Sequence, residues 1–246
     1  MSNAEYNKLF MIETVRNDIR KYLEYYGVVY SKYLSADVTE IELRYKLRAV
    51  KPVVKSEDKI KAASLDELRD IVSECRKCSL YSTRKNIVFG SGSDKEKLVI
   101  VGEAPGADED ESGEPFVGRA GQLLTKMLSA IGIERENVFI CNVLKCRPPN
   151  NRDPLPDEIV KCSGYLDKQL EFLKPKYILA LGRIAAIRLL NTEATMKDLR
   201  EKIHSYKGIP VIVTYHPSAL LRNPNWKYPA WDDLKKLKEL LDKANE

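Results

Sequence analysis

The sequence predicts an α/β fold with a central, mostly parallel sheet covered by helices on both faces, preceded by a helical N-terminal extension. After about residue 62, short apolar and β-branched runs alternate with helical patterns. This alternation is typical of parallel strands joined by helices. The extension differs in composition, because seven of the 13 tyrosines fall before residue 46.

The first 50 residues carry helical patterns. Ile12, Val15, Ile19 and Leu23 recur at helical spacing, and Gly27 is a suitable stop. A second helix is expected across 37–49. The segment that follows is charged and contains Pro52, so we place a linker at 51–62. Residues 63–246 then form the main domain.

The main domain divides into buried strands and amphipathic helices. Strands are expected at 98–101, 138–143, 177–181 and 210–215. Helices are expected at 121–131, 156–173, 183–190 and 196–204, and in a C-terminal segment that aligns Trp231, Leu234, Leu237 and Leu241 on one face. Ligands of such sheets bind at the carboxyl ends of the strands. The segments that follow the strands are therefore the candidate site.

The bulk composition fits a globular protein and excludes few function classes. Hydrophobic residues make up 43% and charged residues 31% of 246 residues. The net charge of +5 favours polyanionic partners only mildly. No apolar run approaches the roughly 20 residues of a membrane span, and the N-terminus lacks the pattern of a secretory signal. We expect a cytoplasmic monomer with no membrane association.

The loop after the first strand, GEAPGADEDESGEPFVG, is rich in glycine and carboxylates. Gly102 and Gly106 allow a tight turn and a close approach to a ligand. The carboxylates are those of Glu103, Asp108, Glu109, Asp110 and Glu111. Phe116 follows a proline, an unusual place for an aromatic ring unless the ring covers something. Taken alone, a solvated acidic loop is the favoured interpretation.

The loops after two further strands carry polar and basic groups. Asn142 ends one strand, where its amide could pair with a ligand or cap a turn. Arg147 and Arg152 flank two prolines and two asparagines, a stiff basic loop suited to phosphates, although a plain surface turn fits as well. His216 ends the last strand. The loop after it combines Ser218 and Arg222, which can donate hydrogen bonds to phosphates, with the apolar Leu220 and Leu221. A carboxylate, an amide and an imidazole at strand ends make one coherent site.

Four of the five cysteines form two pairs. Cys75 and Cys78 are a C-x2-C pair, whereas fifteen residues separate Cys146 from Cys162. Four thiolates suit a zinc ion or a four-iron cluster, and the spacing does not choose between them. Unrelated buried cysteines are the alternative, more plausible for the wide pair. Disulfides are not expected in the cytosol, and Cys141 is interpreted as a small core residue.

The segments GEAPG…EDESGEPFVGRAGQLL, CNVLKCRPPNNRDP and HPSALLRNP together resemble the family 4 (iron–sulfur-containing) uracil-DNA glycosylases. The resemblance runs from about residue 64 to the C-terminus and includes the four paired cysteines. It implies a three-layer uracil-glycosylase-like fold and a 4Fe-4S cluster, with zinc as the alternative. It also implies a monofunctional enzyme that flips uracil out of DNA and hydrolyses its N-glycosidic bond, leaving an abasic site for base excision repair.

The resemblance also implies roles for individual residues. The catalytic residues would be Glu103, beside the hydrolytic water, and His216, facing the uracil O2. The pocket would be formed by Gly102, Glu109 near the C5 edge, Phe116 stacked on the base, and Asn142 at its polar edge. DNA would be contacted by Arg147, Arg152, Ser218, Leu220, Leu221 and Arg222, with one leucine as a wedge in the minor groove. The cluster ligands would be Cys75, Cys78, Cys146 and Cys162.

Other function classes share some of these features. A cluster-containing DNA-binding module without catalysis would not need Glu103, Asn142, Phe116 and His216 together. A nucleotide-binding α/β protein of the common kind would carry a G-x4-G-K-[ST] loop, which this sequence lacks. The extension could build a small helical core or dock a replication or repair partner. Loss of the cluster is expected to misplace Arg147 and Arg152.

Overall fold

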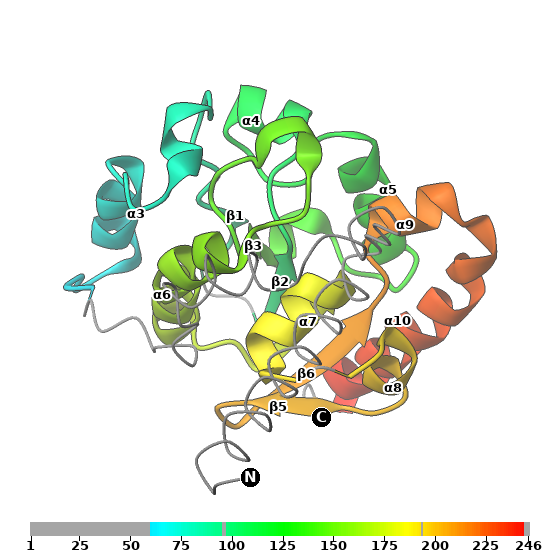
Figure 1. Cartoon of the computed structure of the whole chain (residues 1–246). Coiled ribbons are helices and arrows are strands. Elements are labelled where there is room, and N and C mark those ends of the chain that lie inside the picture. Colours follow the sequence, from blue (N-terminus) through cyan, green and yellow to red (C-terminus); the bar gives the residue numbers. More distant parts are fainter. Residues whose placement is uncertain (1–59, 95–96, 193, 244–246) are drawn as a thin grey trace, which may run out of the picture. The chain divides into compact units, whose positions relative to one another are not determined.

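The computed structural model describes residues 60–94, 97–192 and 194–243. The expected N-terminal helices, the boundary at residue 50 and most of the 51–62 linker lie outside these residues. Within them, six strands form one sheet in the order β1-β3-β2-β4-β6-β5 (Figure 1). The strands are β1 (Ser91–Gly92), β2 (Leu98–Gly102), β3 (Phe139–Asn142), β4 (Tyr177–Leu181), β5 (His204–Tyr206) and β6 (Ile209–Thr214).

The inner strands run parallel and the edges antiparallel. β3, β2, β4 and β6 pair in parallel, while β1 and β5 each pair antiparallel with their neighbour. The register sets Gly102 opposite Asn142 and Leu181 opposite Thr214. The carboxyl ends of the parallel strands therefore line one edge of the sheet. The prediction of a mostly parallel sheet is confirmed.

Alternate residues of each inner strand enter two separate cores, because successive side chains point to opposite faces. Val99 and Val101 pack on one face with residues of α3, α6, α7 and α8. Leu98 and Ile100 pack on the other with α5, α9 and α10. Figure 1 shows α7 and α10 on opposite sides of the sheet. The predicted three-layer arrangement is confirmed.

The described residues form eight α-helices, three of which, at 119–129, 156–173 and 182–190, lie within two residues of their predicted bounds. The eight helices are α3 (Leu65–Ser73), α4 (Ala107–Ser112), α5 (Arg119–Ser129), α6 (Pro156–Leu173), α7 (Gly182–Leu190), α8 (Met196–Arg200), α9 (Pro217–Arg222) and α10 (Lys227–Lys243), with 3-10 turns η1 (Ser79–Ser82), η2 (Arg135–Asn137), η3 (Pro149–Asn151) and η4 (Pro224–Trp226). α6 starts on a proline, and the Glu158 carboxylate accepts the Leu155 N–H at 2.8 Å. Both features favour a helix start. No described helix is long and apolar enough to cross a membrane.

Two local predictions were wrong. The helix expected at 196–204 ends at Arg200, because His204 begins strand β5. The acidic segment after β2 is the helix α4 rather than a solvated loop, and its Asp110 is buried. The predicted C-terminal helix is present as α10, where Leu234 and Leu237 are buried and Trp231 is 41% exposed.

Replacing Leu124 by alanine is expected to lower the free energy of unfolding by about 2–5 kcal/mol. Its side chain is fully buried between α5 and the sheet, so the truncation leaves a cavity. Chemical denaturation measures the change. Ile203, which is 49% exposed, provides the control: its alanine variant should stay within about 0.5 kcal/mol of the parent. Equal losses in the two variants would contradict this core.

Candidate functional site

The polar residues predicted at the strand ends meet around Gly102. A Cβ built on Gly102 would lie 2.4 Å from Asn142 Oδ1 and 2.6 Å from Phe116 Cζ. The Phe116 ring is also 5.5 Å from the His216 ring, at an interplanar angle of 34°. Glycine is thus required at this position so that the side chains of Asn142 and Phe116 can approach each other, with His216 beside the Phe116 ring. The convergence expected from the sequence is present.

Phe116 reaches this position through an unusual backbone. Its φ is +54°, a conformation that non-glycine residues rarely adopt. The side chain is only 6% exposed, and a Cβ on Gly121 in α5 would lie 1.8 Å from the Phe116 carbonyl oxygen. The tight contact with α5 and the burial of the ring hold this backbone. Strain of this kind concentrates at functional sites.

The side-chain oxygen of Asn142 is buried without a hydrogen bond to the described residues. Asn142 is 1% exposed. Among the described residues, its buried Oδ1 has no hydrogen-bond partner. Buried polar atoms are nearly always paired, so an orphan at the centre of a site indicates a missing polar partner. This oxygen accepts no main-chain N–H among the described residues, so it does not cap a turn.

The end of β4 contributes a residue that sequence reasoning missed. Gly182 has a φ of +84°, and a Cβ there would lie 3.0 Å from the Cβ of His216. Both the backbone conformation and the space favour glycine at this position. Its place directly after an apolar strand was the available signal.

His216 is fixed as a neutral ring with one defined tautomer. The Ser218 main-chain N–H donates to His216 Nδ1 at 3.2 Å, and Ser218 Oγ lies 2.8 Å from the same nitrogen. Since a main-chain N–H can only donate, Nδ1 accepts and the proton lies on Nε2. Burial, aided by the charge of Arg222, lowers the pKa of His216 to about 4. Nε2–H is therefore a neutral donor at neutral pH.

The pKa of Glu103 is shifted upward, opposite in direction to that of His216. Burial and, to a smaller extent, the carboxylate of Asp153 together raise the pKa of its carboxyl to about 7, while the charge of Arg222 opposes the rise. The same charge of Arg222 also lowers the pKa of His216. Asp153, in the loop after β3, was not singled out from the sequence. A carboxyl that titrates near neutrality is suited to proton transfer or to orienting water.

Glu109 braces the loop that carries Phe116. Its Oε1 accepts the N–H groups of Val117 and Gly118 at 2.9 and 3.0 Å, and its Oε2 accepts the Gly106 N–H at 3.0 Å. Three bonds to the main chain fix the segment between β2 and α5. These contacts give Glu109 a positioning role, whereas its place at a ligand edge stays a prediction.

The basic loop after β3 is internally bonded. Arg152 forms a two-pronged pair with the buried carboxylate of Glu158, at 2.6 and 2.9 Å. Arg147 Nε donates to Asn151 Oδ1 at 2.8 Å. The pairing of Arg152 anchors the loop to the start of α6, one helical turn before Cys162. Phosphate binding by Arg147 and Arg152 stays a prediction.

The two leucines of the α9 loop have different environments. Leu220 is 1% exposed and packs in the core beneath α9, whereas Leu221 is 38% exposed. Leu220 is thus committed to the interior of the protein. Leu221 is the leucine available for contact with a partner molecule.

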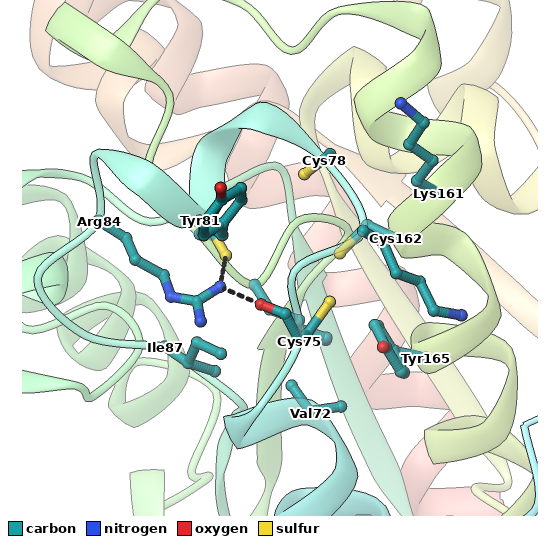
Figure 2. Close-up of a pocket in the computed structure, with 12 residues that line it drawn as sticks. Val72, Cys75, Cys78, Tyr81, Arg84, Ile87, Lys161, Cys162 and Tyr165 are labelled. Atoms are coloured by element: carbon teal, nitrogen blue, oxygen red, sulfur yellow. Dashed lines mark hydrogen bonds between the residues drawn. The ribbon is translucent and has the colours of Figure 1, made fainter.

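The four paired cysteines line one pocket, between the segment that follows α3, the end of β3 and helix α6. Figure 2 shows the sulfurs of Cys75, Cys78 and Cys162 around a common space. Arg84 Nη1 donates to Cys146 Sγ at 3.3 Å and to the Cys75 carbonyl oxygen at 2.9 Å. All five cysteines, each within the described residues, are free thiols. Cys146 and Cys162 therefore belong to the same pocket as the C-x2-C pair.

The pocket disfavours free thiolates, because its thiols are buried. Burial raises the pKa values of Cys78, Cys146 and Cys162, the last to about 12, and the hydrogen bond from Arg84 opposes the rise at Cys146. Among the described residues, no three His, Cys, Asp or Glu side chains form a group that could hold one metal ion.

Lys145 joins this pocket to the strand end that carries Asn142. It is 1% exposed, and its Nζ donates to the Asn142 carbonyl oxygen at 2.7 Å and to Gln169 Oε1 at 2.5 Å. Gln169 Nε2 in turn donates to the Phe89 carbonyl oxygen at 2.9 Å. Burial lowers the pKa of Lys145, while the thiol of Cys141 raises it. Lys145 also lines the cysteine pocket, so one buried side chain contacts both sites.

Comparison with known proteins identifies the family to which this fold and this site belong. Residues 89–235 match the uracil DNA glycosylase superfamily, and the chain belongs to it. The type-4 uracil-DNA glycosylase of Archaeoglobus fulgidus is 48% identical over 188 residues, 73% of this chain and 94% of the relative. That of Thermotoga maritima is 44% identical over 186 residues, 72% and 97% of the two chains.

Comparison with a more distant relative shows to which type within the superfamily this chain is more similar. The type-5 uracil-DNA glycosylase of Pyrobaculum aerophilum is 32% identical over 169 residues, 62% of this chain and 74% of the relative. The type-4 relatives are more similar and are matched over more of their length. Within the superfamily, this chain belongs with the type-4 uracil-DNA glycosylases.

Replacing Asp153 by asparagine is expected to lower the pKa of Glu103 from about 7. A neighbouring negative charge is removed, but burial, the larger cause, is unchanged, so the pKa should stay above 4.5. Carbon-13 NMR titration of the glutamate carboxyls measures it, with Glu103→Gln to assign the signal. Asp157→Asn, at an exposed carboxylate of α6, is the control. An unchanged pKa in Asp153→Asn would refute the proposed charge interaction.

Proposed function

We propose that this chain is a monofunctional glycosylase that flips uracil out of DNA and hydrolyses its N-glycosidic bond, leaving an abasic site in base excision repair. The observation that carries the proposal is the meeting of Asn142 and Phe116 at Gly102, with His216 beside the Phe116 ring and Glu103 next to Gly102 in the chain. The type-4 relatives support the same activity. A DNA-binding module without catalysis would have no need of this arrangement.

Base recognition is assigned to Asn142, Phe116 and Glu109. The orphan Oδ1 of Asn142 would accept the N3–H of uracil, while the amide N–H would donate to O4. Cytosine presents the opposite groups at these positions, and the resulting unpaired buried atoms would penalise it. The Phe116 ring would stack on the base. Glu109 would lie near C5, where thymine carries its methyl group.

Bond cleavage leaves negative charge on the base and positive charge on the sugar. The neutral His216 Nε2–H would donate to the uracil O2 and stabilise the departing anion, a form of electrostatic catalysis. The Glu103 carboxylate would orient water toward the sugar and stabilise its positive charge. Its elevated pKa implies that activity rises with pH toward neutrality, as the carboxyl ionises.

DNA contact is assigned to the loops that surround this site. Arg147, Arg152, Ser218 and Arg222 would bind phosphates, which position the protein on the duplex. Leu221 would enter the minor groove and fill the space left by the flipped base. Its exposure supports this role over Leu220.

We assign a 4Fe-4S cluster to the cysteine pocket, with zinc at the same four cysteines as the alternative. Four cysteine side chains around one pocket supply the ligands that either group requires. Cys75, Cys78, Cys146 and Cys162 would hold the cluster, and Arg84 would donate to a ligand sulfur. When bound, the cluster would link the segment after α3 to β3 and α6.

Context outside the site is also proposed. The free thiols support a cytoplasmic location, and we propose a monomer. The extension, residues 1–50, would build a small helical core or dock a replication or repair partner.

The protein is expected to make an oligonucleotide with one uracil alkali-labile at that position only. Without alkali the strand should stay intact, because no covalent lysine adduct forms. Glu103→Gln and His216→Leu should each lower the single-turnover rate by roughly 100- to 10,000-fold. Gel electrophoresis after alkali treatment measures breakage.

Two controls accompany this assay. A matched thymine strand should not break, and Glu111→Gln, at an exposed carboxylate of α4, should retain the parent rate. Trapping of a protein–DNA adduct by borohydride would overturn the monofunctional mechanism. Absence of breakage with DNA binding retained would favour the non-catalytic module.

Replacing Cys146 by serine is expected to reduce iron content and weaken DNA binding. The loop with Arg147 and Arg152 would then lose its anchor at one end. Elemental analysis and visible absorbance report the cluster, and fluorescence anisotropy reports affinity for duplex DNA. Cys141→Ala is the matched control, since Cys141 is buried in β3 away from the pocket lining. Unchanged DNA affinity in Cys146→Ser would show that the cluster does not position the loop.

A further inference from the structure

An aromatic stack lies directly beside the loop that carries His216. The rings of Tyr215 and Trp226 are stacked, with centroids 4.7 Å apart and an interplanar angle of 21°. The Arg200 guanidinium lies 4.4 Å from the centre of the Tyr215 ring. Arg200, Tyr215 and Trp226 thus join α8, the end of β6 and η4. Tyr215 is the residue immediately before His216 in the chain.

Hydrogen bonds from Arg200 hold one end of this stack in place. Arg200 Nε and Nη2 donate to the two carboxylate oxygens of Asp233 at 2.6 and 3.1 Å, and Asp233 is 1% exposed. Nη2 also donates to the Pro229 carbonyl oxygen. A guanidinium fixed in this way cannot rotate freely, so the Tyr215 and Trp226 rings rest on an ordered base. A rigid aromatic surface loses little conformational entropy when a ligand binds.

The outer part of the stack is open to solvent and surrounded by positive charge. Trp226 is 41% exposed although Tyr215 packs on its ring. Arg222 and Lys227, on either side of η4, are exposed as well. A planar aromatic ring with exposed cations nearby in the chain suits a planar group joined to a phosphate. Nucleobases of DNA meet that description.

We propose that Trp226 is a stacking platform for an unpaired nucleobase of single-stranded DNA next to the target nucleotide. The base would add a further layer to the stack of Arg200, Tyr215 and Trp226, with phosphates near Arg222 and Lys227. In duplex DNA both faces of each base are covered by neighbouring bases, so an open aromatic ring favours unpaired strands. The proposal deepens the proposed function, on which it rests for the position of the target nucleotide.

The sequence offers a direct optical test, because Trp226 and Trp231 are the only tryptophans. Trp231→Phe leaves Trp226 as the sole tryptophan, and Trp226→Phe leaves Trp231. Each full-length variant is titrated with a single-stranded oligothymidine and with a duplex, neither containing uracil. Fluorescence of Trp226 should be quenched by the single strand and much less by the duplex. Fluorescence of Trp231 should change little with either.

A second measurement gives the size of the effect. Trp226→Ala should raise the Kd for the single strand by roughly five- to 150-fold, the equivalent of one base–aromatic stack, and leave the Kd for the duplex within about twofold. Tyr228→Ala, at a neighbouring ring that is 79% exposed and outside the stack, is the control. Trp226→Phe should retain part of the affinity, which separates stacking from loss of folding.

The outcomes separate this proposal from the proposed function. Excision of uracil without quenching of Trp226 would overturn the platform alone. Quenching without excision would leave a single-strand binding surface and overturn the glycosylase. Equal quenching by both forms of DNA, or an equal loss of affinity for both in Trp226→Ala, would overturn the preference for unpaired bases.

Discussion

Asn142, at the end of β3, and Phe116, between α4 and α5, approach the same point, which is where a Cβ of Gly102 would lie. Much else in the structure serves this contact. The parallel pairing of β2 with β3 sets Gly102 beside Asn142, while Glu109 and α5 hold Phe116 in a left-handed backbone conformation. Any larger side chain at Gly102 would separate the amide from the ring. The site therefore depends on the absence of a side chain at Gly102.

Electrostatics complements this packing. The same desolvation that raises the pKa of Glu103 to about 7 lowers that of His216 to about 4. Burial disfavours the charged form of each group, and since one is an acid and the other a base, the shifts have opposite signs. The imidazole is thereby kept neutral and the carboxyl is brought close to its titration midpoint. The charge of Arg222 lowers the pKa of both groups, which links the end of α9 to the chemistry.

The sequence was sufficient for features that depend on periodicity and chain order. The four inner strands, α6 and α7 were found because buried runs and helical faces are encoded locally. The short strands β1 and β5 were missed, since two or three residues are too few for a period to appear. Gly182, Asp153 and the burial of Leu220 depend on contacts between segments distant in the chain. Convergence at the strand ends could be predicted from topology, but the orphan oxygen of Asn142 could not.

The edges of the sheet have a consequence for how the protein behaves at high concentration. β1 spans two residues and β5 three, and each runs antiparallel to the strand beside it. A long free edge would offer a ladder of unsatisfied main-chain groups on which another chain could grow. Edges this short provide too few such groups for intermolecular strand pairing. The described sheet therefore resists growth into the cross-strand aggregates to which exposed β-edges are prone.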